Sequence, residues 1–271
     1  MNKNISTIIT LYKTPNDKFI NLKKYRNFPL FLFEQEGSLI SKNDIKKKLR
    51  FNFNYYFSKK NIGLSKASNF LLNKVKTKYL LFTQADILID YKSILNLKDI
   101  FKKNKDIIFV TPQINSRKNF LHRKKKFSFV KKINAACILC DVNKLKKIGF
   151  FDEDYFLYWE DIDLMNKINQ SRYKMVLANN VYAKHSNNQS SKNDFKTLYL
   201  RRSNFIYGEF LYDFKHKRLR GIKIMRKIIQ NIILFFFNII RIQLKESLKN
   251  FFNLCGVIKF ILFYFKKMIN L

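Results

Sequence analysis

Short apolar runs alternate with helical patterns along the first two thirds of the chain. Apolar runs of strand length occupy residues 5–11, 29–33, 51–57, 79–83, 107–111, 133–142 and 173–178. Helical stretches are predicted at residues 18–25, after Gly63 with Ser65 as the N-cap, at 91–103, and at 142–148 before Gly149. Strands that alternate with helices of about ten residues predict an α/β fold with a mostly parallel central sheet.

Polar residues follow several of these predicted strands. In parallel sheets the ligand binds outside the carboxyl ends of the strands, so the segments 10–14, 34–38 and 84–86 are the ones to inspect. Asp86 follows directly after a fully apolar strand. A carboxylate in that place is positioned to meet a cation or a sugar-nucleotide, and it serves equally well as a turn former or helix cap.

An acidic stretch interrupts this basic chain between residues 148 and 167. It holds six of the nineteen carboxylates and the only tryptophan, Trp159; the acids are Asp152, Glu153, Asp154, Glu160, Asp161 and Asp163. Carboxylates beside aromatic side chains suit acid–base chemistry or metal binding. The alternative is that the last three simply occupy the first turn of a helix, where the helix dipole favours acids.

The charge and the cysteines narrow the class of protein. A net charge of +35 predicts binding to polyanions such as nucleic acid, anionic lipid headgroups or phosphorylated substrates. Three cysteines supply no disulfide framework, and the pair Cys137 and Cys140 lies in an apolar run, which predicts plain buried residues. Residues 5–11 are too short and too polar for a signal peptide, so we expect a cytoplasmic protein.

The composition changes after about residue 195. Residues 214–271 contain thirteen Lys or Arg and one acid, Glu246. Their apolar runs, 228–240 and 251–265, are shorter than the roughly 18–20 residues that span a bilayer. We therefore predict a basic amphipathic helical extension that lies on an anionic membrane surface; packing on the catalytic domain or on a partner is the alternative. The predicted division is residues 1–213 and 214–271.

Five segments in order resemble the motifs of family-2 glycosyltransferases with the GT-A fold, specifically the rhamnosyltransferase-like branch. The most specific is GFFDEDYFLYWEDIDL at residues 149–164. The others are NIGLSKASN (61–69), LLFTQAD (80–86), KHSNNQSS (184–191) and RRSN (201–204). The resemblance spans roughly residues 5–210, and it implies a GT-A type nucleotide-sugar-binding fold.

The resemblance also implies a reaction and its residues. The expected activity is inverting sugar transfer, of hexosyltransferase type, from a nucleotide-diphosphate donor to a saccharide or lipid-linked acceptor in cell-surface polysaccharide synthesis. Asp161 matches the catalytic base, with Glu160 beside it. Asp86 matches the metal-contacting Asp, and His185 resembles a residue that completes the site for Mg²⁺ or Mn²⁺. Donor-binding positions are implied at Thr10, Tyr12, Glu34, Asn61, Gly63 and Asp86. The expected location is the inner face of the cell membrane.

The sequence departs from the family pattern in two places. Glu34 stands where the family has an Asp that meets the nucleobase, and Gln84 occupies the first acidic position of the DxD motif. Two alternative functions, from other classes of protein, stay open. A nucleic-acid-binding protein is favoured by the charge and the 16% aromatic content, although no RNA-recognition, zinc-finger or helix-turn-helix signature is present. A non-catalytic protein that binds the membrane periphery is the other.

Overall fold

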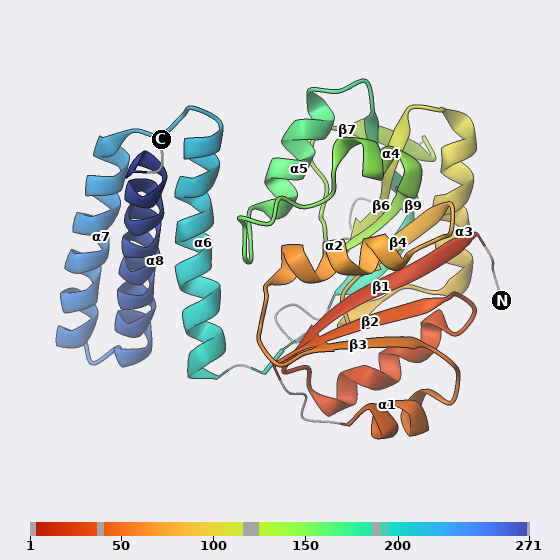
Figure 1. The fold of residues 1–271 in the computed structure, drawn as a ribbon, viewed down its shortest axis with the longest axis horizontal. Helices are drawn as coiled ribbons and strands as arrows, with labels where there is room; N and C mark the ends of the chain where they lie inside the picture. Colours follow the sequence, from red (N-terminus) through yellow and green to blue (C-terminus); the bar gives the residue numbers. More distant parts are fainter. Residues whose placement is uncertain (1–3, 37–40, 116–124, 186–190, 193, 270–271) are drawn as a thin grey trace. The chain divides into compact units, whose positions relative to one another are not determined.

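The computed structural model describes residues 4–36, 41–115, 125–185, 191–192 and 194–269 (Figure 1). The chain divides into two compact units. The first unit comprises Met1–Asp152 and Leu164–Lys192, and the second comprises Glu153–Asp163 and Asn193–Leu271. The division at residue 214 that the composition suggests stays a prediction.

The first unit is built on a mixed sheet with the strand order β3-β2-β1-β4-β8-β6-β9-β5, to which β7 adds on β9. The strands are β1 (Ile5–Tyr12), β2 (Leu30–Gln35), β3 (Asn54–Ser58), β4 (Tyr79–Thr83), β5 (Ile87–Leu88), β6 (Ile107–Ile114), β7 (Phe127–Val130), β8 (Cys137–Asp141) and β9 (Lys174–His185). The pairs β3–β2, β2–β1, β1–β4 and β6–β9 are parallel. Strand β8 runs antiparallel between β4 and β6, so β4 and β6 point the same way.

Helices cover both faces of this sheet. They are η1 (Asn16–Tyr25), α1 (Lys42–Leu49), α2 (Leu64–Lys74), α3 (Tyr91–Ile100) with its 3₁₀ continuation η2 (Phe101–Lys103), α4 (Val142–Ile148) and α5 (Glu160–Asn169). One apolar cluster joins the sheet to η1, α1 and α3, and a second joins it to α2, α4 and the later part of α5. Ile5 and Ile9 of β1 belong to the first cluster and Ile8 to the second, because alternate strand residues face opposite sides. Strands buried on both faces read as continuous apolar runs.

The α/β fold is confirmed, and most predicted strands are present. Three details differ. Residues 18–25 form a 3₁₀ helix. Residues 127–130 form β7, although they belong to a basic segment, 113–132, for which the sequence predicts a mobile loop or a solvated face. Helix α2 begins after Gly63, whose φ of 89° suits glycine, and Ser65 is buried inside the helix instead of capping it. Cys137 and Cys140 are buried in β8, as predicted.

Helix α1 was absent from the sequence-based prediction. Its sequence KNDIKKKL has two buried apolar residues, Ile45 and Leu49, spaced by four. Ser41 caps it by accepting a hydrogen bond from the Asp44 backbone N–H at 3.2 Å. A mostly charged octapeptide has too few apolar positions to reveal a helical period, so its packing on η1 stabilises it.

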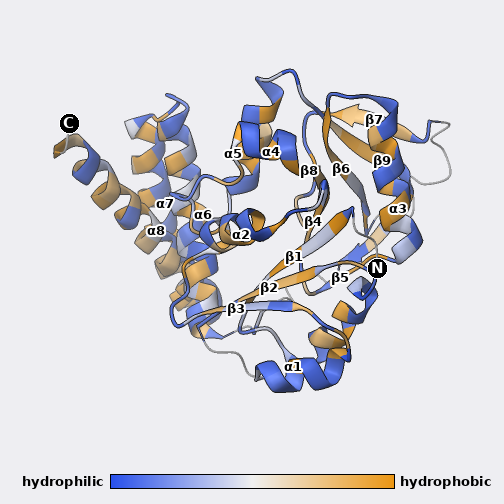
Figure 2. Cartoon of the chain, turned by 45° about the vertical axis from the view of Figure 1, so that its right-hand side comes forward, coloured by the Kyte–Doolittle hydropathy of each residue, from blue (hydrophilic) through white to orange (hydrophobic). Residues whose placement is uncertain are grey.

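The second unit consists of the acidic loop, which we define as residues 153–163, and the helices α6 (Phe195–Lys215), α7 (Gly221–Ile240) and α8 (Leu244–Ile269). Helix α8 packs against both α6 and α7. The core of the unit contains Phe210 from α6, Phe260 from α8 and Tyr155 from the acidic loop. Figure 2 shows apolar residues along the length of α7 and α8.

Helix α8 corrects the prediction about the C-terminal apolar runs. In the part of the chain that the structure describes, α8 alone is long and apolar enough, by length and composition, to cross a membrane. The prediction that residues 251–265 are too short to do so is wrong as to length, because the helix continues on both sides of that run.

Candidate functional site

The first unit brings Asp86 and His185 together at one edge of the sheet. The carboxyl ends of β4, β6 and β9 meet there, because these strands run parallel. Strand β5, which follows Asp86, pairs antiparallel with the end of β9 and sets Ile87 opposite His185. The Nε2 atom of His185 lies 3.4 Å from Oδ2 of Asp86, whose side chain is fully buried. Residues 99 positions apart in sequence thus form one pair.

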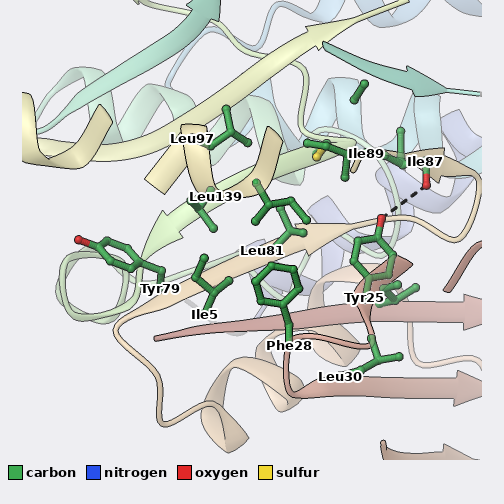
Figure 3. Close-up of a cluster of buried hydrophobic side chains, with 14 of the residues drawn as sticks. Ile5, Tyr25, Phe28, Leu30, Tyr79, Leu81, Ile87, Ile89, Leu97 and Leu139 are labelled. Carbon is green, nitrogen blue, oxygen red and sulfur yellow. Dashed lines mark hydrogen bonds between the residues drawn. The ribbon is translucent and has the colours of Figure 1, made fainter. Parts of the chain in front are cut away.

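Side chains from other elements bind the backbone of His185 and of Ile87, the residue that follows Asp86. Asn115, just after β6, donates to the His185 carbonyl oxygen at 2.7 Å and accepts from the His185 backbone N–H at 2.7 Å. The Tyr25 hydroxyl of η1 donates to the Ile87 carbonyl oxygen at 3.5 Å, as Figure 3 shows. Sequence reasoning missed both residues. The one sequence signal that could have pointed to Asn115 is an Asn shortly after an apolar strand, because Asn tolerates the left-handed backbone, here with a φ of 55°.

The Asp86–His185 pair fits a divalent cation. A carboxylate oxygen and an imidazole nitrogen are ligands that Mg²⁺ and Mn²⁺ accept, with phosphate oxygens and water in the other positions. Within the described ranges, no group of three or more His, Cys, Asp or Glu side chains forms a closed metal cage. A two-residue donor set leaves most coordination positions to a phosphate-bearing ligand, as expected where a metal bridges protein and nucleotide.

The predicted donor-binding residues of β1 and β2 lie at the same edge. Thr10 and Tyr12 occupy the end of β1, opposite Phe33 and Gln35 of β2. Glu34 is buried and accepts a short hydrogen bond from the Tyr55 hydroxyl of β3. Burial raises the pKa of Glu34, and the Tyr55 hydrogen bond opposes that rise. Glu34 therefore has a partner inside the sheet, and its role toward a nucleobase stays a prediction.

The segment that contains Asn61 and Gly63 is tied to the end of β2. The Ile62 backbone N–H donates to Gln35 Oε1 at 2.9 Å, and the Gly63 N–H donates to Asn61 Oδ1 at 3.0 Å. Further along α2, Asn69 donates to the Phe151 carbonyl oxygen at 2.8 Å and accepts from the Phe151 N–H at 3.1 Å. The two asparagines of this motif thus have structural tasks that link three loops of the first unit.

In the second unit, the acidic loop leads into the N-terminus of α5 with an unusual backbone. Tyr158 and Trp159 have φ values of 69° and 72°, in the left-handed region that bulky residues seldom adopt. Such strain persists only where the surrounding structure stabilises it. Trp159 lies between Phe205 and Tyr212 of α6, with ring centroids 5.9 and 5.5 Å away.

Burial at the start of α5 changes the acidity of its carboxylates. Burial, and then the neighbouring Asp161, raise the pKa of Glu160 to about 8. Burial also raises the pKa of Asp161, although the Ile162 backbone N–H donates to Asp161 Oδ1 at 2.9 Å. The sequence predicted the opposite for Asp161, a pKa lowered by the helix dipole. That prediction is wrong because desolvation outweighs the favourable backbone groups.

The other acids of the loop contact the end of α6. His216 Nε2 lies 2.9 Å from Oδ1 of the buried Asp163, and the Lys215 Nζ lies 2.6 Å from Asp154 Oδ2. The Lys-rich sequence around His216 predicts a solvated side chain, which is wrong, since its ring also lies 4.3 Å from that of Tyr212. Asp154 and Asp163 thus serve to attach the acidic loop to the helices, while Glu160 and Asp161 start α5.

Glu160 makes stability depend on pH. The unfolded chain loses this proton near pH 4.5, whereas the folded chain keeps it to about pH 8. The folded state therefore binds more protons in that window, and the free energy of unfolding falls as pH rises, by an amount on the order of 4 kcal/mol. Denaturant unfolding at pH 5 and at pH 8 measures this decline, and Glu160→Gln should remove it.

The matched control is Glu153→Gln, at an exposed position of the same loop, which should keep the wild-type decline. An equal difference in the free energy of unfolding between the two pH values in all three proteins would contradict the assignment.

Gly208 of α6 makes room for the strained loop. A Cβ at residue 208 would lie 2.8 Å from Trp159 Cδ1 and 3.1 Å from the Tyr158 carbonyl oxygen. Gly208→Ala should therefore displace Trp159, destabilise the protein by about 1–3 kcal/mol and alter the Trp159 fluorescence. Gly221→Ala is the control, because nothing lies within 4 Å of its added Cβ. Equal melting temperatures for the two variants would show that the loop does not depend on this close approach.

Some predicted residues lie outside the described ranges. These are Gly37 and Ser38 after β2, His122 in the basic segment, and Ser186 and Ser190 after His185. The predicted catalytic pair Glu160 and Asp161 belongs to the second unit, whereas Asp86, His185 and the predicted donor-binding positions belong to the first.

Comparisons with known proteins agree with this fold. Residues 40–164 match the family model described as glycosyl transferase family 2, a range that includes Asp86 and the whole acidic loop. A mannosyltransferase, PcManGT from Pyrobaculum calidifontis, solved with GDP-Man and Mn²⁺, is 13% identical with a TM-score of 0.57. The match covers 79% of this chain and 65% of that one. No curated protein matches the chain in a sequence search.

S. aureus TarS is a second structural match. Its fragment 1–349 is 14% identical with a TM-score of 0.54, covering 95% of this chain and 89% of that one. The same fragment solved with UDP-GlcNAc has a TM-score of 0.50 over 76% of this chain and 66% of that one. Residues 40–164 therefore match glycosyl transferase family 2, as the motifs predicted, and the fold is of the GT-A type. Its assignment to the rhamnosyltransferase-like branch stays a prediction.

Proposed function

We propose that this protein transfers a sugar from a nucleotide-diphosphate donor to a hydroxyl of a saccharide or lipid-linked saccharide, with inversion at the anomeric carbon. The observation that carries the proposal is the Asp86–His185 pair at the carboxyl edge of the sheet. That edge is where open α/β sheets bind their ligands. The family match covers Asp86 and the acidic loop together.

The first unit supplies the donor side of this proposal. A divalent cation held by Asp86 and His185 would neutralise charge on the departing diphosphate, which is the electrostatic contribution that metals make in phosphoryl chemistry. Thr10, Tyr12, Glu34, Asn61 and Gly63 are the positions that we assign to the donor. The mannosyltransferase match was solved with GDP-Man and Mn²⁺ and the TarS fragment with UDP-GlcNAc, which supports a nucleotide-sugar of either kind.

Asp161 supplies the base in this proposal. Its carboxylate accepts the proton of the acceptor hydroxyl while that oxygen forms a bond to the anomeric carbon. The bond from that carbon to the diphosphate oxygen breaks in the same displacement, which inverts the configuration. A single displacement needs one base and charge stabilisation of the leaving group, and no second acid. The raised pKa of Asp161 makes it a stronger proton acceptor than an exposed Asp. Glu160, protonated at neutral pH by its own raised pKa, adds no repelling charge.

We assign the reaction to the cytoplasm and to cell-surface polysaccharide synthesis, and we propose a hexose as the transferred sugar. The support is the similarity of the motifs to glycosyltransferases of that kind and the lack of a disulfide framework.

A nucleotide-sugar screen tests the proposed function. The purified chain is incubated with GDP- and UDP-sugars and with Mn²⁺, and binding is measured as a rise in melting temperature. Donor hydrolysis or transfer is then followed by release of the nucleoside diphosphate. We expect a rise with one or a few donors and release that needs Asp161. Salt-sensitive binding to oligonucleotides with no response to any donor would instead support a nucleic-acid-binding protein.

A further inference from the structure

Helix α7 presents its most apolar face outward. Most of its exposed apolar residues recur at spacings of three and four, which places them in one stripe; they are Ile222, Met225, Ile229, Ile232, Ile233, Phe236 and Ile240. The exposed Leu234, Phe237 and Ile239 do not belong to that series. Ile240 is 80% exposed. The neighbouring helix α8 adds Ile258, Leu262 and Phe265, which are also exposed. We call this set of side chains the α7–α8 face.

The inward side of α7 is the more polar one. Asn231 is buried, and its Oδ1 accepts a hydrogen bond at 2.8 Å from Asn253 Nδ2 of α8. Lys223 pairs with Glu209 at 2.8 Å and with Asp213 at 2.6 Å, both on α6. In a helix that packs in water the polar residues point out and the apolar residues point in, so α7 is inverted with respect to that pattern.

The contact between α8 and α6 is close and includes a polar pair. A Cβ at Gly256 would lie only 2.4 Å from the Ser203 carbonyl oxygen, so the two backbones approach closely. The Lys259 Nζ donates to Asn204 Oδ1 at 2.5 Å across the same contact. This close, hydrogen-bonded contact ties α8 to α6, so α8 could not enter a bilayer without α6.

Basic residues lie at the ends of the α7–α8 face. Because α7 runs antiparallel to α6 and α8, the end of α6, the start of α7 and the end of α8 lie at the same end of the unit (Figure 1). That end carries Lys217, Arg218, Arg220, Arg226, Lys266 and Lys267, besides Lys215, Lys223 and Lys227, which pair with Asp154, Glu209 or Asp213. Arg241, Lys245 and Lys249 lie at the opposite end, with Glu246 as the only acid between residues 214 and 271. Each Lys or Arg near an anionic bilayer contributes about 1 kcal/mol.

We propose that the α7–α8 face inserts into the outer part of one leaflet of an anionic bilayer, with α7 lying in the plane of the membrane. The uncharged segment 228–240 of α7 is about 20 Å long, less than the roughly 30 Å hydrocarbon core. Helix α8 has the length to cross, but it packs against α6, which carries Glu209 and Asp213 and would have to enter the bilayer with it. Shallow insertion lets the basic ends reach the headgroups while the apolar face meets acyl chains.

Vesicle binding of the full chain tests this proposal without any use of its activity. The test variant Ile229→Asp/Phe236→Asp alters the α7–α8 face, where these residues are 53% and 58% exposed. The control Ile20→Asp/Phe129→Asp makes the same changes in the first unit, at residues that are 53% and 54% exposed. All four positions are exposed, so both variants should keep the wild-type melting temperature. Binding is measured by flotation with neutral phosphatidylcholine vesicles and with vesicles containing phosphatidylserine.

We expect wild type and control to float with the anionic vesicles, with at least tenfold less binding to neutral ones, and the test variant to lose at least about tenfold. Equal flotation of test variant and control would overturn the proposal. So would a dimer in light scattering that the test variant abolishes while flotation stays unchanged, because a second copy would then cover this face. Resistance of the test variant to alkaline extraction from vesicles would instead indicate that α8 crosses the bilayer.

Discussion

Replacing Asp161 with Asn should lower the rate of sugar transfer by about 10²- to 10⁴-fold, the usual contribution of a positioned base. The substitution keeps the size of the side chain and its acceptor oxygen for the Ile162 N–H, which donates at 2.9 Å, so the start of α5 should stay folded. The amide cannot take the proton of the acceptor hydroxyl. Transfer is measured under single-turnover conditions, and donor binding is measured separately as the thermal shift with the same nucleotide-sugar.

The control for Asp161→Asn is Glu153→Gln, which removes one exposed charge from the same loop. It should retain transfer within about twofold. The pH profile adds a second readout: because burial raises the pKa of Asp161, the acid side of the wild-type profile should fall at a higher pH than the ordinary Asp value of 3.8. Full transfer by Asp161→Asn would remove the base assignment, whereas loss of donor binding with loss of transfer would point to a folding defect.

Asp86→Ala should abolish the dependence of the protein on Mg²⁺ or Mn²⁺ and lower transfer by about 10²- to 10³-fold, because the charge on the departing diphosphate then lacks its stabilising cation. A chelator should have the same effect on the wild type. The direct readout is binding of Mn²⁺ by calorimetry in the presence of the nucleoside diphosphate, which does not require turnover.

Asp90→Asn is the matched control for this experiment. Asp90 lies four residues further on and caps α3 by accepting from the Ser93 N–H at 2.8 Å, a task that Asn also performs. It should leave Mn²⁺ binding unchanged. Transfer that is indifferent both to the chelator and to Asp86→Ala would show that the Asp86–His185 pair is not a metal site. The absence of metal binding would then be explained by Gln84, which replaces the first acid of the DxD motif and leaves Asp86 as its single carboxylate.

The strands and helices that could be predicted are those whose apolar residues recur with a clear spacing. Strand β4 reads as an almost continuous apolar run, and β1 as an apolar run interrupted only by Ser and Thr, because both faces of each strand are buried. Helix α2 was found from its apolar spacing. Helix α1 and strand β7 were missed, since a short, charged or half-exposed segment has no period of its own and is stabilised by its neighbours.

The candidate site was predictable where it rests on short motifs. Asp86, His185, Glu160 and Asp161 were all named from local sequence and its resemblance to family 2. Asn115 and Tyr25 were not, because they act on His185 and Ile87 from elements 70 and 62 residues away. His216 was misjudged for a similar reason: its Lys-rich surroundings in sequence indicate solvent, while the fold places its ring beside Asp163 and Tyr212.

By itself, the sequence determined the order of the strands and helices that have a clear hydrophobic period, the positions of the acidic groups and the basic, apolar character of residues 214–271, because these depend on local spacing and composition. Only the tertiary structure decided which groups meet and how strongly they hold their protons. The contact between Asp86 and His185 depends on the pairing of β5 with β9. The raised pKa values of Glu160 and Asp161 depend on burial, which reverses the effect that the helix dipole alone would have. The outward apolar face of α7 likewise depends on which side of that helix packs against α8, and an amphipathic period read from sequence does not say which side faces in.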